Sequence, residues 1–218
     1  SLYQDMSVEE NLRFFATLFG TTIEANYDLI RDIYSQIEPF RTRRAGALSG
    51  GMKQKLALSC ALIHKPSVLF LDEPTTGVDP VSRKELWEML AKPRCQGITI
   101  LVSTPYMDEA SRCDRIALIR GGRFLDIDTP KRIIEKFGER LWAVSGDRMP
   151  AMLKTLRRHP QITSAFAFGD THHATPDATL TEKQLAAYLT AEGYRNLRIE
   201  AIEPGIEDCY MKLDRTNE

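Results

Sequence analysis

The chain has 218 residues, of which 43% are hydrophobic and 27% are charged, and its formal net charge is -1. This length allows one large domain or two small ones, each with a sizeable core. The near-zero charge argues against a general nucleic-acid binder, because such proteins show a basic stripe or domain. No apolar run approaches the ~20 residues that span a bilayer, and the first residues lack the pattern of a signal peptide.

The first part of the chain predicts helices followed by alternating strands and helices. Apolar residues at helical spacing predict helices over 7–19, 27–38 and 50–64. The elements expected next are strand 68–71, helix 81–91, strand 98–102, helix 106–112, a hairpin of 116–119 with 124–127, and a helix from 130 to 137. The strands at 68–71 and 98–102 are continuously apolar, which is typical of strands buried on both faces of a parallel sheet.

The pattern changes after Gly138, where we place a domain boundary. The elements expected there are strand 141–145, helix 150–158, strand 162–168, strand 171–175, helix 181–192, strand 197–202 and a last helix over 205–213. The order βαββαβ is that of a ferredoxin-like or split βαβ domain. The sequence thus predicts an α/β domain with a parallel sheet over 1–138 and a small α+β domain over 139–218.

Two adjacent carboxylates, Asp72 and Glu73, follow the first apolar strand. Ligands of open α/β sheets bind at this carboxyl edge. The first carboxylate is suited to hold a Mg²⁺ that bridges phosphates, and the second to orient or deprotonate an attacking water. The alternative is a strand end that simply turns polar at the surface, and this dipeptide alone does not decide between the two.

A second candidate site is the run Ser49-Gly50-Gly51 at the start of the third helix. The serine is a natural N-cap, and glycines let the backbone approach a ligand closely. The free amides of the first helical turn then form an anion site. For this run alone, an ordinary capped helix after a loop is the favoured interpretation. Its occurrence together with the two carboxylates is far more specific.

Four motifs resemble those of the ATP-binding subunits of ABC transporters. In order, they are the signature usually written LSGGQ at Leu48–Met52, with Met52 where Gln is common, the Walker B strand at Leu69–Pro74, the D-loop at Thr76–Pro80, and the switch segment at Ser103–Ala110. The resemblance covers roughly residues 1–138 and implies a P-loop NTPase-like parallel sheet with a helical subdomain. The first residues resemble the segment just after the family's Q-loop.

The resemblance implies a role for each matching residue. Asp72 would bind Mg²⁺, and Glu73 would be the general base. Ser49, Gly50 and Gly51 would contact the γ-phosphate of ATP held by the opposite subunit of a head-to-tail dimer, at whose interface Asp79 would lie. The implied partners are a second ATPase subunit and a transmembrane permease, with no nucleic acid, and the implied location is the cytoplasmic face of a bacterial cell membrane.

The tail of the chain, Ala201–Asp208, is similar to that of ATPases that drive ABC-2 type exporters. In that context the small C-terminal domain would regulate the ATPase or stabilise its dimer. A packing domain without a ligand is an equally good interpretation.

Two departures from the family pattern limit what the chain is expected to do. The sequence has no G-x-x-x-x-G-K-[ST], the loop that cradles the phosphates. Without the N-terminal segment that holds this loop, the strands at 68–71 and 98–102 are expected to expose apolar faces and unpaired edges. The second departure is Pro105, which stands where the family has the switch histidine. Proline has no side-chain hydrogen-bond donor. The chain alone is expected to be inactive, and hydrolysis to stay slow after completion.

Three rival interpretations remain. The chain could be a non-catalytic subunit that lends only its signature motif to ATP bound by a partner, or a truncated product. Family members that act on DNA or ribosomes are a further rival, but the long coiled coils or basic linkers typical of them do not occur here.

Other candidate residues favour structural roles. His172-His173 has no ligand partner at metal spacing, and we expect it on a surface hairpin. Arg41–Arg44 is expected to be a solvated loop, with phosphate or lipid headgroups as the alternative contact. The four cysteines form no C-x-x-C pair, which argues against a zinc site and for free thiols.

Overall fold

The computed structural model describes residues 2–216 of the chain. The chain divides into two compact units, Ser1–Pro105 and Tyr106–Glu218. The domain boundary that the sequence predicts near residue 139 falls inside the second unit. That boundary stays a prediction.

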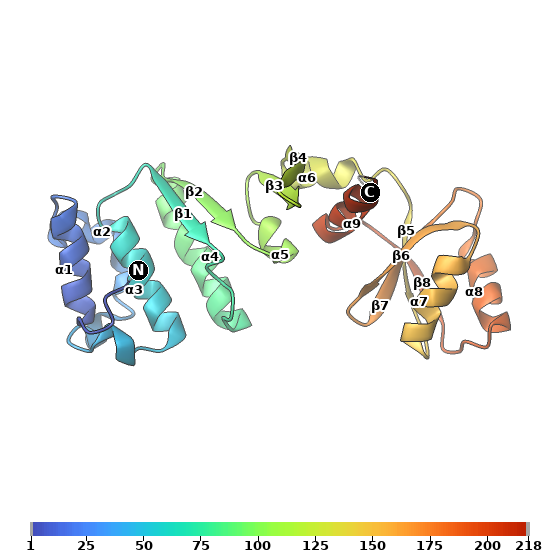
Figure 1. Cartoon of the computed structure of the whole chain (residues 1–218), viewed down its shortest axis with the longest axis horizontal. Coiled ribbons are helices and arrows are strands. Elements are labelled where there is room, and N and C mark those ends of the chain that lie inside the picture. Colours follow the sequence, from blue (N-terminus) through green and yellow to red (C-terminus); the bar gives the residue numbers. More distant parts are fainter. Residues whose placement is uncertain (1, 217–218) are drawn as a thin grey trace. The chain divides into compact units, whose positions relative to one another are not determined.

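The first unit combines helices with a short parallel sheet (Figure 1). Its elements are α1 (Val8–Leu18), α2 (Tyr27–Tyr34), α3 (Gly50–Leu62), β1 (Val68–Asp72), α4 (Pro80–Cys95) and β2 (Thr99–Ser103), with 3-10 turns at Glu24–Asn26, Glu38–Phe40 and Ala45–Ala47. A capping box opens α1, because Ser7 Oγ accepts from the Glu10 amide at 3.1 Å and the Glu10 carboxylate accepts from the Ser7 amide at 2.7 Å. One buried apolar cluster joins α1–α4 to the inner face of the sheet.

The second helix is shorter than the sequence predicts. It ends at Tyr34, and Glu38–Phe40 forms a separate 3-10 turn instead of the last helical turn. Pro39 explains the difference, because proline lacks an amide donor, clashes with the preceding turn and disfavours helical geometry in the residue before it.

Strands β1 and β2 pair in parallel, with Phe70 opposite Leu101 and Asp72 opposite Ser103. Leu69 and its neighbours on the inner face pack on the helices. On the outer face, Val68 is 44% exposed, Phe70 72% and Leu101 59%. The predicted exposure of an apolar face in this chain is confirmed, and the prediction of strands buried on both faces is wrong for the chain as it stands.

The second unit contains a hairpin and a four-stranded sheet (Figure 1). Its elements are α5 (Met107–Ala110), β3 (Ile116–Arg120), β4 (Arg123–Asp128), α6 (Pro130–Glu135), β5 (Leu141–Ser145), α7 (Met149–Arg158), β6 (Ile162–Phe168), β7 (Thr171–Pro176), α8 (Glu182–Ala191), β8 (Arg198–Ile202) and α9 (Ile206–Thr216). The sheet is antiparallel in the order β6-β7-β5-β8, and it confirms the predicted βαββαβ pattern.

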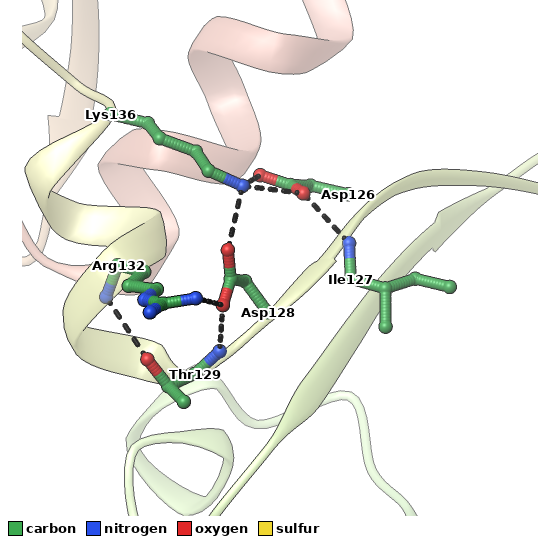
Figure 2. Close-up of polar contacts among 6 residues, drawn as sticks. All are labelled: Asp126, Ile127, Asp128, Thr129, Arg132 and Lys136. Atoms are coloured by element: carbon green, nitrogen blue, oxygen red, sulfur yellow. Dashed lines mark hydrogen bonds and ion pairs between the residues drawn. The ribbon is translucent and has the colours of Figure 1, made fainter.

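The hairpin turns at Gly121 and Gly122, whose φ angles of 54° and 76° favour glycine. Lys136, just past α6, reaches back to the second strand of the hairpin (Figure 2). Its Nζ lies 2.9 Å from both carboxylate oxygens of Asp126 and 3.1 Å from Asp128. These pairs hold α6 against the hairpin, and a separate apolar cluster packs both on α9.

Candidate functional site

The predicted carboxylates lie at the carboxyl end of β1, as the strand pattern indicates. Asp72 pairs in register with Ser103 of β2, and the Ser103 hydroxyl donates to the Asp72 carboxylate. The Glu73 amide in turn donates to the Ser103 carbonyl and hydroxyl oxygens, each at 3.1 Å. Ser103 therefore fixes the position of both acidic residues from the neighbouring strand.

Glu73 adopts a backbone conformation that is rare outside glycine, with φ of 43°. A residue held there costs on the order of 1–3 kcal/mol and needs surrounding contacts to keep it in place. Two of those contacts come from Thr76, whose amide donates to the Glu73 carbonyl at 3.1 Å and whose hydroxyl donates to the Glu73 carboxylate at 3.0 Å. The turn presents the Glu73 side chain at the exposed edge of the sheet.

The signature segment begins α3 as predicted. Ser49 is the N-cap, and its hydroxyl accepts from the Met52 amide at 3.4 Å. A Cβ added at Gly50 would meet nothing within 4 Å, and one added at Gly51 would lie 3.5 Å from the Ser82 hydroxyl. The first turn of α3 therefore offers open backbone amides, the arrangement that binds anions.

Asp79 is the N-cap of α4, a role that the sequence prediction did not assign. Its carboxylate accepts from the Val81 and Ser82 amides, each at 3.0 Å. Hydrogen bonds from Ser82, first of all from its side chain, hold the pKa of Asp79 below its usual value. The aspartate is exposed and ionised, which leaves it available for contact with another subunit.

The signature helix and the acidic loop are linked within the first unit. The Gln54 side chain, one turn into α3, donates to the Pro74 carbonyl at 2.7 Å. Among residues 2–216, no hydrogen bond joins Ser49, Gly50 or Gly51 directly to Asp72 or Glu73. Within the first unit, the signature helix and the acidic loop are thus connected by the Gln54 side chain. The sequence did not reveal this role of Gln54, because the hydrogen bond depends on the tertiary fold.

The residues at the strand edge suit a magnesium ion held together with phosphates. Mg²⁺ prefers oxygen ligands and is bound through one or two carboxylates with substrate phosphates and waters. Asp72 provides an exposed carboxylate whose hydrogen bond from Ser103 orients it. Among residues 2–216, no three His, Cys, Asp or Glu side chains gather into a metal site of their own.

The two adjacent histidines do lie on a hairpin, β6–β7, but the prediction that it is a surface hairpin is wrong. Both lie on β7, which is flanked by β6 and β5 inside the sheet. His172 is 4% exposed and its Nε2 lies 2.7 Å from the Met149 carbonyl oxygen. His173 Nδ1 lies 2.7 Å from the Asp208 carboxylate. Each ring is therefore engaged in packing the C-terminal sheet.

Comparison with known proteins agrees with the motifs. The family model for "ABC transporter" matches residues 1–76. The Nod factor export ATP-binding protein I of Rhizobium sp. (strain N33) is 33% identical over 218 residues, which cover 98% of this chain and 69% of the relative. The chain belongs to the ATP-binding proteins of ABC transporters. The probable multidrug ABC transporter ATP-binding protein YbhF of Escherichia coli K12 is 35% identical over 97% of this chain, which spans only 37% of that relative's length.

Solved structures of this family share the fold. The "Structure of ATP binding subunit of ABC transporter" matches with a TM-score of 0.54 and 32% identity, over 63% of this chain and 59% of that one. The cbiO1 protein of Clostridium perfringens, part of the ABC transporter complex cbiONQ, matches with a TM-score of 0.53 and 25% identity over 72% and 63%. The predicted α/β fold of the ABC ATPase type is confirmed. No helix in residues 2–216 of this ABC protein has the length and apolarity to cross a membrane.

Proposed function

We propose that this ABC protein forms the C-terminal portion of the energy-coupling ATPase of an ABC-2 type exporter. The observation that supports it best is the pairing of an open glycine-led helix start with two exposed carboxylates fixed by Ser103. Such elements suit a nucleotide bound between two subunits. The carboxylates of one subunit and the helix start of the other would then face the same phosphates. Two of the relatives are named for multidrug transport and for Nod factor export, which supports export over import.

In the proposed site each residue has one task. Asp72 holds Mg²⁺, which neutralises phosphate charge when ATP is bound. Glu73 accepts a hydrogen bond from the attacking water and takes its proton. Ser49, Gly50 and Gly51 donate hydrogen bonds to the γ-phosphate of ATP held by a second subunit. Asp79 lies at the contact between the subunits.

The proposal includes a second ATPase subunit, a membrane permease and a position at the cytoplasmic face of the cell membrane. It also requires the segment that precedes these motifs in longer relatives, because that segment holds the phosphate-cradling loop. The bare outer face of β1 and β2, with Phe70 at its centre, supports this requirement. The chain alone is therefore proposed to be inactive.

The test is a steady-state ATPase assay on a longer protein in which the corresponding N-terminal segment of the Rhizobium relative precedes Ser1. We expect slow hydrolysis, because Pro105 cannot donate to the γ-phosphate. Pro105→His should raise the rate by about 10²–10³-fold, the usual effect of one such donor. Glu73→Gln in the Pro105→His background should abolish turnover while leaving ATP binding intact. Equal rates with Pro105 and His would contradict the proposed role of this position.

A non-catalytic subunit is the second candidate, and Pro105 is the observation that favours it. Such a subunit would bind nucleotide and contribute Ser49–Gly51 to a partner's site without hydrolysing its own ATP. A fluorescent ATP analogue, titrated into the chain with and without the added N-terminal segment, separates the cases. Binding that appears only with the segment, combined with no turnover even in Pro105→His, would favour the non-catalytic role.

A further inference from the structure

A hollow of about 270 Å³ lies in the second unit, between α9 and strands β6 and β7. It opens on the face of the sheet opposite α7. On β7, for example, Ala174 belongs to the apolar cluster that includes α7, whereas His173 and Thr175 on either side of it line the hollow. None of the residues proposed for ATP binding lines it. The hollow is therefore a separate feature of the C-terminal domain.

Ion pairs fix the wall that α9 contributes. The Asp208 carboxylate bonds His173 Nδ1 of β7 at 2.7 Å and accepts from the Gly205 amide at 2.8 Å. One turn later, Lys212 Nζ lies 2.6 Å from the Glu139 carboxylate and donates to the Phe137 carbonyl at 2.5 Å. Four of the charged or titratable groups around the hollow are thus already paired, and they hold its shape without a ligand.

Two groups in the hollow have capacity left for a ligand. No partner for the Arg215 guanidinium is recorded among residues 2–216, and it lies at the exposed rim. The Thr175 hydroxyl is on the floor, in a residue that is only 4% exposed. It accepts from Ser164 Oγ at 3.0 Å, so its own proton remains for donation. A cation at the rim and a donor on the floor both favour an anion.

We propose that this hollow binds a small organic carboxylate. Arg215 receives the carboxylate, because a guanidinium fork matches its two oxygens, and Thr175 donates a further hydrogen bond. Phe166 and Leu141 provide the apolar surface for the rest of the ligand. The volume lies just below the ~300–1,000 Å³ of ordinary ligand pockets, which limits the ligand to about one ring in size.

Ligand binding here would strengthen the docking of α9. This helix carries Asp214, which pairs with Arg120 of the hairpin, and its apolar side packs on α6. A ligand that bridges α9 and the sheet binds only the docked form, so it raises the unfolding temperature of the second unit. This effect does not depend on ATP, and it can be measured apart from the proposed transport function.

The test is a titration of the ¹⁵N-labelled 218-residue chain with benzoate, followed by NMR, with benzyl alcohol as the uncharged comparator. We expect saturable shifts at Thr175 and its neighbours with a dissociation constant in the millimolar range, because the probe is small. Arg215→Gln should weaken benzoate binding by about 10–100-fold, the usual effect of a hydrogen bond to a charged group. Thr175→Val keeps the shape of the side chain and removes the donor, so it should weaken benzoate binding severalfold.

Arg158→Gln is the matched control, since it removes the same charge from an exposed site on α7, on the other face of the sheet. It should leave benzoate binding unchanged. Absence of saturable shifts, equal binding by benzyl alcohol, or unchanged binding in Arg215→Gln would each overturn the proposal. Phenyl phosphate is a further probe, and tighter binding of it than of benzoate would overturn the assignment to carboxylates.

Discussion

The bare outer face of β1 and β2 gives the sharpest stability prediction. Fully burying a Val, Leu or Phe side chain is worth about 1.5–3 kcal/mol. The exposed fractions of Val68, Phe70 and Leu101 amount together to a little under two whole side chains. Covering this face should therefore stabilise the first unit by about 3–5 kcal/mol, before the cost of ordering the covering segment.

Phe70→Ala tests this in two contexts by urea unfolding. In the 218-residue chain, where Phe70 is 72% exposed, the substitution should lower the free energy of unfolding by less than about 1 kcal/mol. In the longer protein with the N-terminal segment of the Rhizobium relative, it should cost about 3–5 kcal/mol, the usual cost of truncating a buried Phe.

Leu69→Ala is the control on the same strand. Leu69 is 5% exposed and packs on the helices of the first unit, so its truncation should cost about 2–5 kcal/mol in both contexts. If Phe70→Ala cost the same in the short and the long protein, the outer face would not be the surface that the preceding segment covers. That result would refute the covering of Phe70 even if the longer protein bound ATP.

Three further predictions concern single side chains. His64 has its pKa lowered by burial, and its Nδ1 has no hydrogen-bond partner in the described chain. As pH falls, His64 therefore becomes protonated in the unfolded state before it does in the folded state, and the free energy of unfolding should decrease below about pH 6.5. Urea unfolding at about pH 7 and about pH 5.5 measures this decrease, which should be smaller in His64→Gln. Burial raises the pKa of Cys60 to about 12, whereas Cys95 is exposed. A thiol reagent should label Cys95 in the native protein and Cys60 only in denaturant, and early labelling of Cys60 would contradict its burial. Lys136→Met removes the two ion pairs that Lys136 makes with Asp126 and Asp128 (Figure 2). It should lower the unfolding temperature in low salt but not in high salt, because pairs near the surface are screened.

Much of the fold followed from local pattern. The βαββαβ order of the C-terminal domain was predictable because strand and helix periods alternate there with clear turns. The error at α2 was also local, since Pro39 is visible in the sequence and proline predicts a helix end. The error at His172-His173 was different, because only the strand order places β7 inside the sheet. A polar dipeptide beside a turn does not reveal such a position.

The candidate site shows the same division between local and tertiary information. The sequence identified Asp72 and Glu73 because an apolar strand that ends in carboxylates has a chemical meaning by itself. It missed Ser103, which is placed beside Asp72 only by the parallel register of β1 and β2. It also missed Gln54, whose partner is a backbone carbonyl twenty residues away in sequence. Residues that position others are identified only when the pairing of elements is known.

The continuous apolar runs of β1 and β2 have a further meaning. A strand apolar at every position fits a sheet that is covered on both faces, yet in this chain only one face is covered. The apolar run therefore fits a sheet covered on both faces better than it fits the sheet that these 218 residues form. Phe70 is exposed at the centre of that face, beside the carboxylates of β1, and under the proposed function one N-terminal segment would both cover it and grip the phosphates. Folding and nucleotide binding should then be restored together, and a longer protein that covered Phe70 without binding ATP would refute this link.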